Sequence, residues 1–140
     1  AYTYSLRPKR LPLPTLPAVE LAYIAGIVDG EGCISVEMNK NGAITLRLTV
    51  ANTNKDVIDW LSIRFGGSIH IREKKGKWRT VYAWYESNSS RVVEILELLL
   101  PYSIIKREQM MLAVQWIPGM DKSLAANVEM KIKNLNQGIQ

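Results

Sequence analysis

The chain has 140 residues, one cysteine (Cys33) and a formal net charge of +5, with a pI near 9.4. This length suffices for one domain with a hydrophobic core, and the positive charge favours polyanionic partners through steering and counterion release. An intrachain disulfide is excluded, and no apolar run reaches the ~18 residues of a membrane span, so we expect an intracellular protein with no membrane partner. No small-molecule substrate is expected either.

Residues 1–17 hold four of the six prolines together with Arg7, Lys9 and Arg10, and no acid. This composition predicts a Pro-rich, extended N-terminal arm that precedes a single domain over residues 18–140. Contact of the arm with phosphates is one interpretation. A simple leader before the first helix is the one that the composition favours.

After this arm we predict a helix whose two edges differ in the side chains that they carry. One edge is apolar at helical spacing: Leu21, Ile24, Ala25 and Val28. The other carries small residues at every fourth position: Ala18, Ala22, Gly26 and Gly30. Because small residues let two helix backbones approach closely, we expect this edge to pack against a second helix.

The helix is predicted to end around Glu31, which lies between Gly30 and Gly32. Glycine permits the positive φ values at which many helices end. A carboxylate at a helix C-terminus opposes the macrodipole and needs a compensating cation. If two such helices paired, two Glu31 carboxylates and helix carbonyls would form an oxygen-rich site suited to Mg²⁺.

The remaining strands and helices are predicted from the spacing of apolar residues, which alternates in the strands and has a helical period in the helices. We predict strands over residues 33–39 and 44–51, joined by a turn at Asn41-Gly42. A helix then starts at Thr53, which forms a capping arrangement with Asp56, and ends at Gly66-Gly67. A second hairpin, 68–74 and 78–86, precedes a helix over 91–100 with Ser89 or Ser90 as its cap. Helices over 103–117, ended by Pro118-Gly119, and about 123–135 complete the chain.

The strand alternation places polar side chains, whose charges are mostly positive, on one face of the sheet: Ser35, Glu37, Asn39, Thr45, Arg47, Thr49, His70, Arg72, Lys74 and Arg79. Any solvated sheet face is polar. However, β-ribbons fit the DNA major groove, and side chains of these types read base edges there. We therefore hypothesise that this set binds double-stranded DNA.

Residues 24–32, Ile-Ala-Gly-Ile-Val-Asp-Gly-Glu-Gly, resemble the LAGLIDADG motif of homing endonucleases and related intron-encoded proteins. The sequence departs from the motif at Gly30, in place of alanine, and at Glu31, in place of the usual aspartate. The resemblance implies an α+β fold of order αββαββα, whose antiparallel four-stranded sheet has helices on one face and lies as a saddle on the duplex. A single motif copy implies a homodimer, with Ala22, Ala25, Gly26 and Asp29 at its interface.

The resemblance also assigns catalytic and metal-binding roles. Glu31, with the backbone carbonyl of Gly30, would hold Mg²⁺. Lys106 matches the family's lysine near the scissile phosphate, with Arg107 as a rival. Asn52 matches a polar residue that organises solvent, although Thr53 and Asn54 lie close enough to leave the register open. For Asp29 a structural hydrogen-bonding role is expected.

Together these features predict a site-specific homing endonuclease that makes a staggered double-strand cut in a long pseudo-palindromic target by metal-dependent hydrolysis. One alternative is an intron-RNA-binding maturase or a non-cleaving DNA-binding protein of the same fold. Another is a basic protein-interaction domain. The expected compartment is an organelle or a prokaryotic or archaeal cytoplasm, between which the residues do not decide.

Overall fold

The computed structural model describes residues 2–6, 11–38, 44–73, 79–116 and 122–137. In chain order the elements are β1 (Tyr2–Tyr4), α1 (Ala18–Glu31), β2 (Gly32–Met38), β3 (Ile44–Asn52), α2 (Lys55–Phe65), β4 (Ser68–Arg72), β5 (Val81–Glu86), α3 (Ser89–Leu99), the 3-10 helix η1 (Leu100–Tyr102), α4 (Arg107–Ala113) and α5 (Lys122–Asn136). The α+β class and the αββαββα order from α1 onward are confirmed. Asn39 and Lys74, both predicted to bind DNA, and the turn at Asn41-Gly42 lie outside the described residues.

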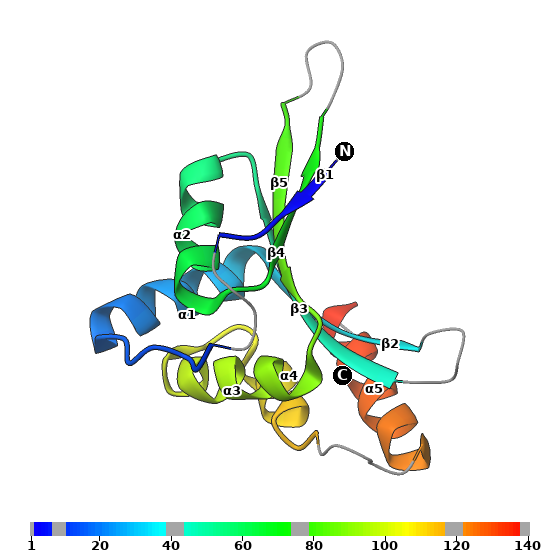
Figure 1. Ribbon diagram of the computed structural model, residues 1–140. Helices are drawn as coiled ribbons and strands as arrows, with labels where there is room; N and C mark the ends of the chain where they lie inside the picture. Colours follow the sequence, from blue (N-terminus) through cyan, green and yellow to red (C-terminus); the bar gives the residue numbers. More distant parts are fainter. Residues whose placement is uncertain (1, 7–10, 39–43, 74–78, 117–121, 138–140) are drawn as a thin grey trace.

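The strands form one antiparallel sheet in the order β1-β4-β5-β3-β2. The helices gather on one side of this bent sheet, and the two hairpins diverge from its middle (Figure 1). The four predicted strands are therefore present, but the sheet has a fifth. Residues 2–4, which the prediction assigned to an arm before the domain, pair with β4 and extend its sheet.

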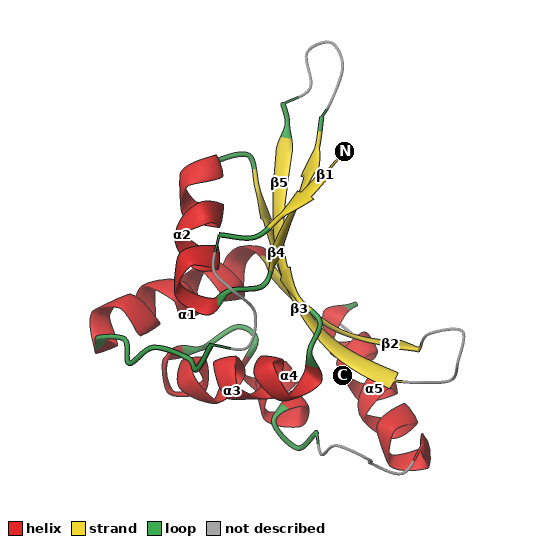
Figure 2. Cartoon of the chain, in the orientation of Figure 1, coloured by secondary structure: helices red, strands yellow, loops and turns green. Residues whose placement is uncertain are grey.

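The hydrophobic core lies between the sheet and the helices that cover it (Figure 2). Ile24 and Val28 of α1, Leu48 of β3, Trp84 of β5 and Ile95 of α3 are at most 1% exposed. The apolar edge of α1 thus faces inward, as predicted. Burial of each such side chain stabilises the fold by about 1.5–3 kcal/mol.

Two helix caps differ from the prediction, and in both cases an asparagine replaces the expected hydroxyl residue. The side chain of Asn54 accepts a hydrogen bond from the amide of Val57 at 3.1 Å, and Asn88 caps α3 in the same way. Thr53 and Ser90 are not the caps, and the hydroxyl of Ser89 instead accepts from the amide of Leu46 in β3 at 2.9 Å. An Asn side chain at the N-cap satisfies one free helix amide, which is why it can replace Ser or Thr there.

The helix predicted from residue 103 begins only at Arg107. The backbone amides of Ile104, Ile105 and Lys106 are turned away from a helical path because they donate to the side chain of Asp29. A tertiary contact has thus shortened the helix at its N-terminus. Over the described ranges, no helix is both long and apolar enough to cross a membrane.

Candidate active site

Glu31 is the last residue of α1, and β2 begins at the next residue. Gly32 is extended, with φ of −81° and ψ of 161°, and its amide donates to the carbonyl of Val28. The prediction that a positive φ ends this helix is therefore wrong. Glycine is required for another reason: a Cβ on Gly32 would lie 2.7 Å from the Val28 oxygen and 2.9 Å from its Cα. The tight exit directs the exposed Glu31 side chain to the end of the helix.

Asp29, one turn before the end of the helix, points the other way, into the protein. It is 9% exposed. Its carboxylate accepts four hydrogen bonds: Oδ1 from the Ser103 hydroxyl at 2.5 Å and the Lys106 amide at 3.1 Å, and Oδ2 from the amides of Ile104 at 2.8 Å and Ile105 at 3.1 Å. Burial alone would raise the pKa of this carboxyl, but the hydrogen bonds outweigh burial and hold the pKa below its ordinary value. Asp29 thus fastens residues 103–106 to α1.

This attachment brings Lys106 to the same helix end as Glu31. Besides its amide contact, the Lys106 Nζ donates to the backbone carbonyl of Asp29 at 3.3 Å. Arg107, the rival cation, is directed elsewhere, because its Nε donates to the carbonyl of Ser103 at 3.0 Å. Of the two predicted candidates, Lys106 is the one that contacts the end of α1.

Asn52, the last residue of β3, lies directly beside Glu31. Its Nδ2 donates to Glu31 Oε2 at 2.5 Å, while its Oδ1 accepts from the amide of Asn54 at 2.7 Å. The second bond fixes which end of the amide faces the carboxylate. Asn54 is occupied as the cap of α2, so among the neighbouring positions it is Asn52 that supplies the contact to Glu31.

The donor groups at this point are hard oxygens, which suit Mg²⁺. Within the part of the chain that the structure describes, no three His, Cys, Asp or Glu side chains come together as a metal cluster. One chain therefore contributes a single carboxylate, that of Glu31, and carbonyl oxygens of the helix end. This donor chemistry fits the predicted metal.

An open groove runs from this helix end along the small-residue edge of α1, with Ala22, Gly26, Gly30 and Glu31 in its lining. Ala18 and these three small residues are exposed, and a Cβ added at Gly26 or Gly30 would meet no atom within 4 Å. The interface prediction needs correction at two residues: Ala25 is fully buried in the chain's own core and Asp29 is bonded within the chain. Both belong to the inner side of α1, so Ala22 and Gly26 are the predicted interface residues that face outward.

The sheet face without helices carries the described members of the predicted DNA-binding set except Arg79, which precedes β5. Strand pairing sets Ser35 opposite Arg47, and Glu37 opposite Thr45. The Arg47 guanidinium lies 4.4 Å from the centre of the Tyr85 ring and 3.6 Å from the Glu37 carboxylate. The remaining described members, Thr49, His70, Arg72 and Arg79, are half-buried or exposed.

Sequence reasoning missed two contributors to this face, Tyr85 and Thr3. For Tyr85 a signal existed, since an inward Trp84 places its neighbour outward in an alternating strand. For Thr3 the sequence carried no such signal, because three residues are too few for an alternating pattern to define a strand. Its hydroxyl lies 3.4 Å from Nδ1 of His70 in the neighbouring strand.

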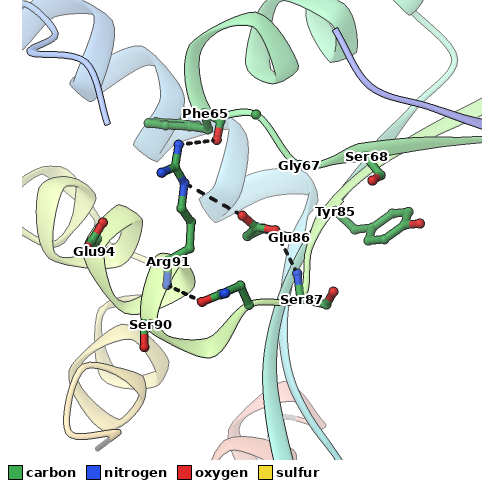
Figure 3. Close-up of a pocket in the computed structure, with 11 residues that line it drawn as sticks. Phe65, Gly67, Ser68, Tyr85, Glu86, Ser87, Ser90, Arg91 and Glu94 are labelled. Atoms are coloured by element: carbon green, nitrogen blue, oxygen red, sulfur yellow. Dashed lines mark hydrogen bonds and ion pairs between the residues drawn. The ribbon is translucent and has the colours of Figure 1, made fainter. Parts of the chain in front are cut away.

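A second hollow, between the end of α2 and the start of α3, is lined by Phe65, Gly67, Ser68, Tyr85, Glu86, Ser87, Ser90, Arg91 and Glu94, among others (Figure 3). Its central cation is already occupied. Arg91 donates to the carbonyls of Phe65 at 3.0 Å and of Leu11, and lies 3.8 Å from the Glu86 carboxylate. This hollow therefore joins segments of the fold, and its cation is not available for a ligand.

Comparison with known families finds a match to the model of a LAGLIDADG-like domain over residues 18–106, more than half of the chain. A sequence search of curated proteins finds no match. The matched range includes the helix that carries Glu31, both predicted hairpins, and ends at Lys106. Glu31, Asn52 and Lys106 therefore all lie within the match.

Several solved structures share the fold. The homing endonuclease I-CvuI in complex with DNA is 24% identical, with a TM-score of 0.68 over 84% of this chain and 82% of that chain. The archaeal intron-encoded homing endonuclease I-Vdi141I, complexed with DNA, is 16% identical, with a TM-score of 0.52 over 85% of this chain and 98% of that one. A variant of I-SmaMI is 18% identical, with a TM-score of 0.59 over 90% of this chain but 45% of that one.

Proposed function

The chain belongs to the LAGLIDADG family, and from this premise we propose that it is a site-specific homing endonuclease that makes a staggered double-strand cut in duplex DNA. The observation that carries the proposal is the contact of Asn52 with Glu31 at the end of α1, together with the Lys106 amine bonded to the backbone carbonyl of Asp29 two residues earlier. These residues come from three separate parts of the chain. An acid, an amide and an amine at one point, beside an open polar sheet, are the groups that phosphodiester hydrolysis uses.

The active form in this proposal is a homodimer on a pseudo-palindromic target. The exposed small-residue edge of α1, continued by Val19 at 75% and Tyr23 at 59% exposure, is an unpaired surface on which a second copy of α1 could pack. Two-fold pairing there would bring both Glu31 carboxylates to one axis. The coverage of 45% of I-SmaMI against 82% of I-CvuI is what we expect if some relatives carry two such units in one chain.

Mg²⁺ is the metal that the donor set suits, and the Glu31 carboxylate of each chain with the Gly30 carbonyl would hold it. When bound, it supplies Lewis-acid stabilisation of phosphate charge and a more acidic water. Asn52 orients the Glu31 carboxylate by donating to one of its oxygens. Lys106, positioned through the attachment of its loop to Asp29, adds positive charge where the phosphate becomes more negative.

The outer sheet face would supply DNA binding. Its cations contact phosphates or base edges, and its hydroxyl and amide groups read bases in the major groove. The stacking of Arg47 on Tyr85 holds the guanidinium in a defined position at the surface. A guanidinium that is already oriented loses less conformational entropy when it binds a guanine edge.

The decisive experiment is cleavage of a long duplex DNA library by the purified protein with Mg²⁺. We expect double-strand cuts at defined sites, and a loss of about 10³-fold in Glu31→Gln. Glu97→Gln is the matched control, because Glu97 is an exposed acid on α3 and is not one of the three site residues. Absence of site-specific cutting by the wild-type protein, or equal cutting by Glu31→Gln, would contradict the proposal.

The dimer is tested separately by sedimentation. Gly26→Leu places a bulky side chain on the exposed edge of α1, where an added Cβ meets no atom within 4 Å. We expect it to lower the dimer fraction without unfolding the protein. Ala126→Leu, a similar enlargement at an exposed position of α5, should leave the dimer intact; an equal effect of both variants would argue against pairing through α1.

The alternative is a protein of the same fold that binds intron RNA or DNA without cutting. The observation that favours it is Glu31 itself, which is one methylene longer than the aspartate usual in the motif and so shifts the carboxylate. Tight binding of a structured intron RNA, with no cleavage of DNA under any divalent cation, would support this alternative.

A further inference from the structure

The structure extends the sheet by a strand that the αββαββα order does not include. β1 (Tyr2–Tyr4) pairs antiparallel with β4, so that Thr3 lies opposite His70 and Tyr4 opposite Ile69 (Figure 1). β4 is thereby no longer the edge of the sheet. The question is which groups this added strand presents, and to which side.

The side chain of Tyr4 settles the orientation of β1. Its hydroxyl donates to Asp59 of α2 at 2.6 Å, and Lys55 of α2 lies 5.7 Å from the centre of its ring. Tyr4 therefore lies on the helix-covered side. Because successive side chains of a strand point to opposite faces, Thr3 projects from the open face. Ser5 follows the strand, and its contact with Ser68 places it on the same side.

The contacts of Thr3 and Ser5 agree with this orientation. The Thr3 hydroxyl lies 3.4 Å from Nδ1 of His70, and the Ser5 hydroxyl lies 3.3 Å from that of Ser68. Both partners belong to β4, on the face that carries the predicted DNA-binding residues. Thr3 and Ser5 remain exposed, so their hydroxyls stay accessible to a ligand on that face.

From this placement we propose that β1 is part of the DNA-reading surface, with Thr3 and His70 as a specificity-determining pair. The proposal rests on the function proposed above and names residues that act in it. A hydroxyl can donate to or accept from a base edge, and an imidazole beside it can do the same. The Tyr4 contact to α2 holds the strand in place, so that the pair is preorganised.

The competing explanation is that β1 only covers the edge of β4, which protects a sheet from pairing with other chains. Covering an edge needs backbone hydrogen bonds and is indifferent to the hydroxyl of Thr3. DNA reading needs the hydroxyl. Thr3→Val separates the two, because valine keeps the branched shape that suits a strand but cannot form a hydrogen bond.

The test is selection of bound sequences from a random duplex DNA library, with Ca²⁺ in place of Mg²⁺ so that binding is scored without cutting. For Thr3→Val we expect discrimination to fall by about fivefold at one or two positions of each half-site, with the other positions unchanged. Thr15→Val is the matched control, since Thr15 is exposed but outside the sheet. It should select the wild-type sequences.

A gain-of-charge variant provides a second measurement. Thr3→Arg should bring one more cation to the DNA phosphates. Between 50 and 200 mM salt, the DNA affinity of this variant should therefore fall by a factor about three times larger than that of the wild-type protein. Glu97→Gln changes the net charge by the same amount on α3 and should leave the salt dependence nearly unchanged.

The outcomes separate the two levels of the proposal. If the wild-type protein selects a sequence and both Thr3 variants match it in base preference and salt dependence, β1 only covers the edge and the inference is overturned. If the wild-type protein selects no sequence, the proposed function itself fails, and the inference fails with it.

Discussion

Substitution of Asp29 by asparagine should reveal how strongly one buried carboxylate holds the candidate site together. The carboxylate accepts four hydrogen bonds from residues 103–106. Asparagine has only one acceptor oxygen. Its NH₂ group therefore takes the place of either Oδ1 or Oδ2 and must face the hydrogen-bond donors that this oxygen served. In the less costly orientation the NH₂ replaces Oδ1: the Ser103 hydroxyl can rotate and accept, but the Lys106 amide loses its partner.

The cost follows from the individual bonds. A buried amide without a partner costs about 1–3 kcal/mol, and each of the two remaining bonds becomes weaker by about 1 kcal/mol because its acceptor is no longer charged. Cheaper desolvation of the neutral side chain offsets part of this loss. We expect Asp29→Asn to lower the free energy of unfolding by about 3 kcal/mol, which for a chain of this size lowers Tm by about 10 °C.

The measurement is thermal and urea unfolding followed by circular dichroism, at neutral pH, with amide hydrogen exchange of residues 104–106. Those amides should lose protection, and DNA cleavage should fall because Lys106 is no longer held at the end of α1. Asp56→Asn, at an exposed position in the first turn of α2, should cost less than about 1 kcal/mol. Equal effects of the two substitutions, or unchanged protection of the amides, would refute the reasoning.

Three further predictions concern the scaffold. Burial and the hydrogen bond to Asp59 raise the pKa of Tyr4 to about 12. The contribution of this contact to stability should therefore be complete below the unfolded pKa of about 10 and lost between pH 10 and 12; tyrosinate absorbance should show a late titration step that Tyr4→Phe removes. Asn54→Ala removes the cap of α2 and should cost about 1 kcal/mol in urea unfolding, with an unchanged m-value. Gly67→Ala should cost more than about 3 kcal/mol, since φ is +73° and the new Cβ would lie 2.6 Å from the Tyr85 carbonyl; a loss under 1 kcal/mol would show that the backbone can shift.

Some parts of the candidate site were predictable because their signals are local. Glu31 was found from the small residues and glycines around it, and the outward set on β2 and β3 from alternation alone. Asn52 was predicted only to within two positions, because its contact with Glu31 joins residues 21 positions apart. The caps at Asn54 and Asn88 were missed since several hydrogen-bonding side chains compete near each helix start.

What the sequence determined by itself is therefore the order of helices and strands, the inward and outward faces, and the family motif at the end of α1. These depend on periods of two and 3.6 residues, which the chain carries locally. Only the tertiary structure decided that Asp29 turns inward to hold Lys106, that Gly32 is required by a close approach to Val28, and that residues 2–4 form a strand. Each of these findings depends on a contact that forms only when the chain folds, and a local sequence pattern does not contain that information.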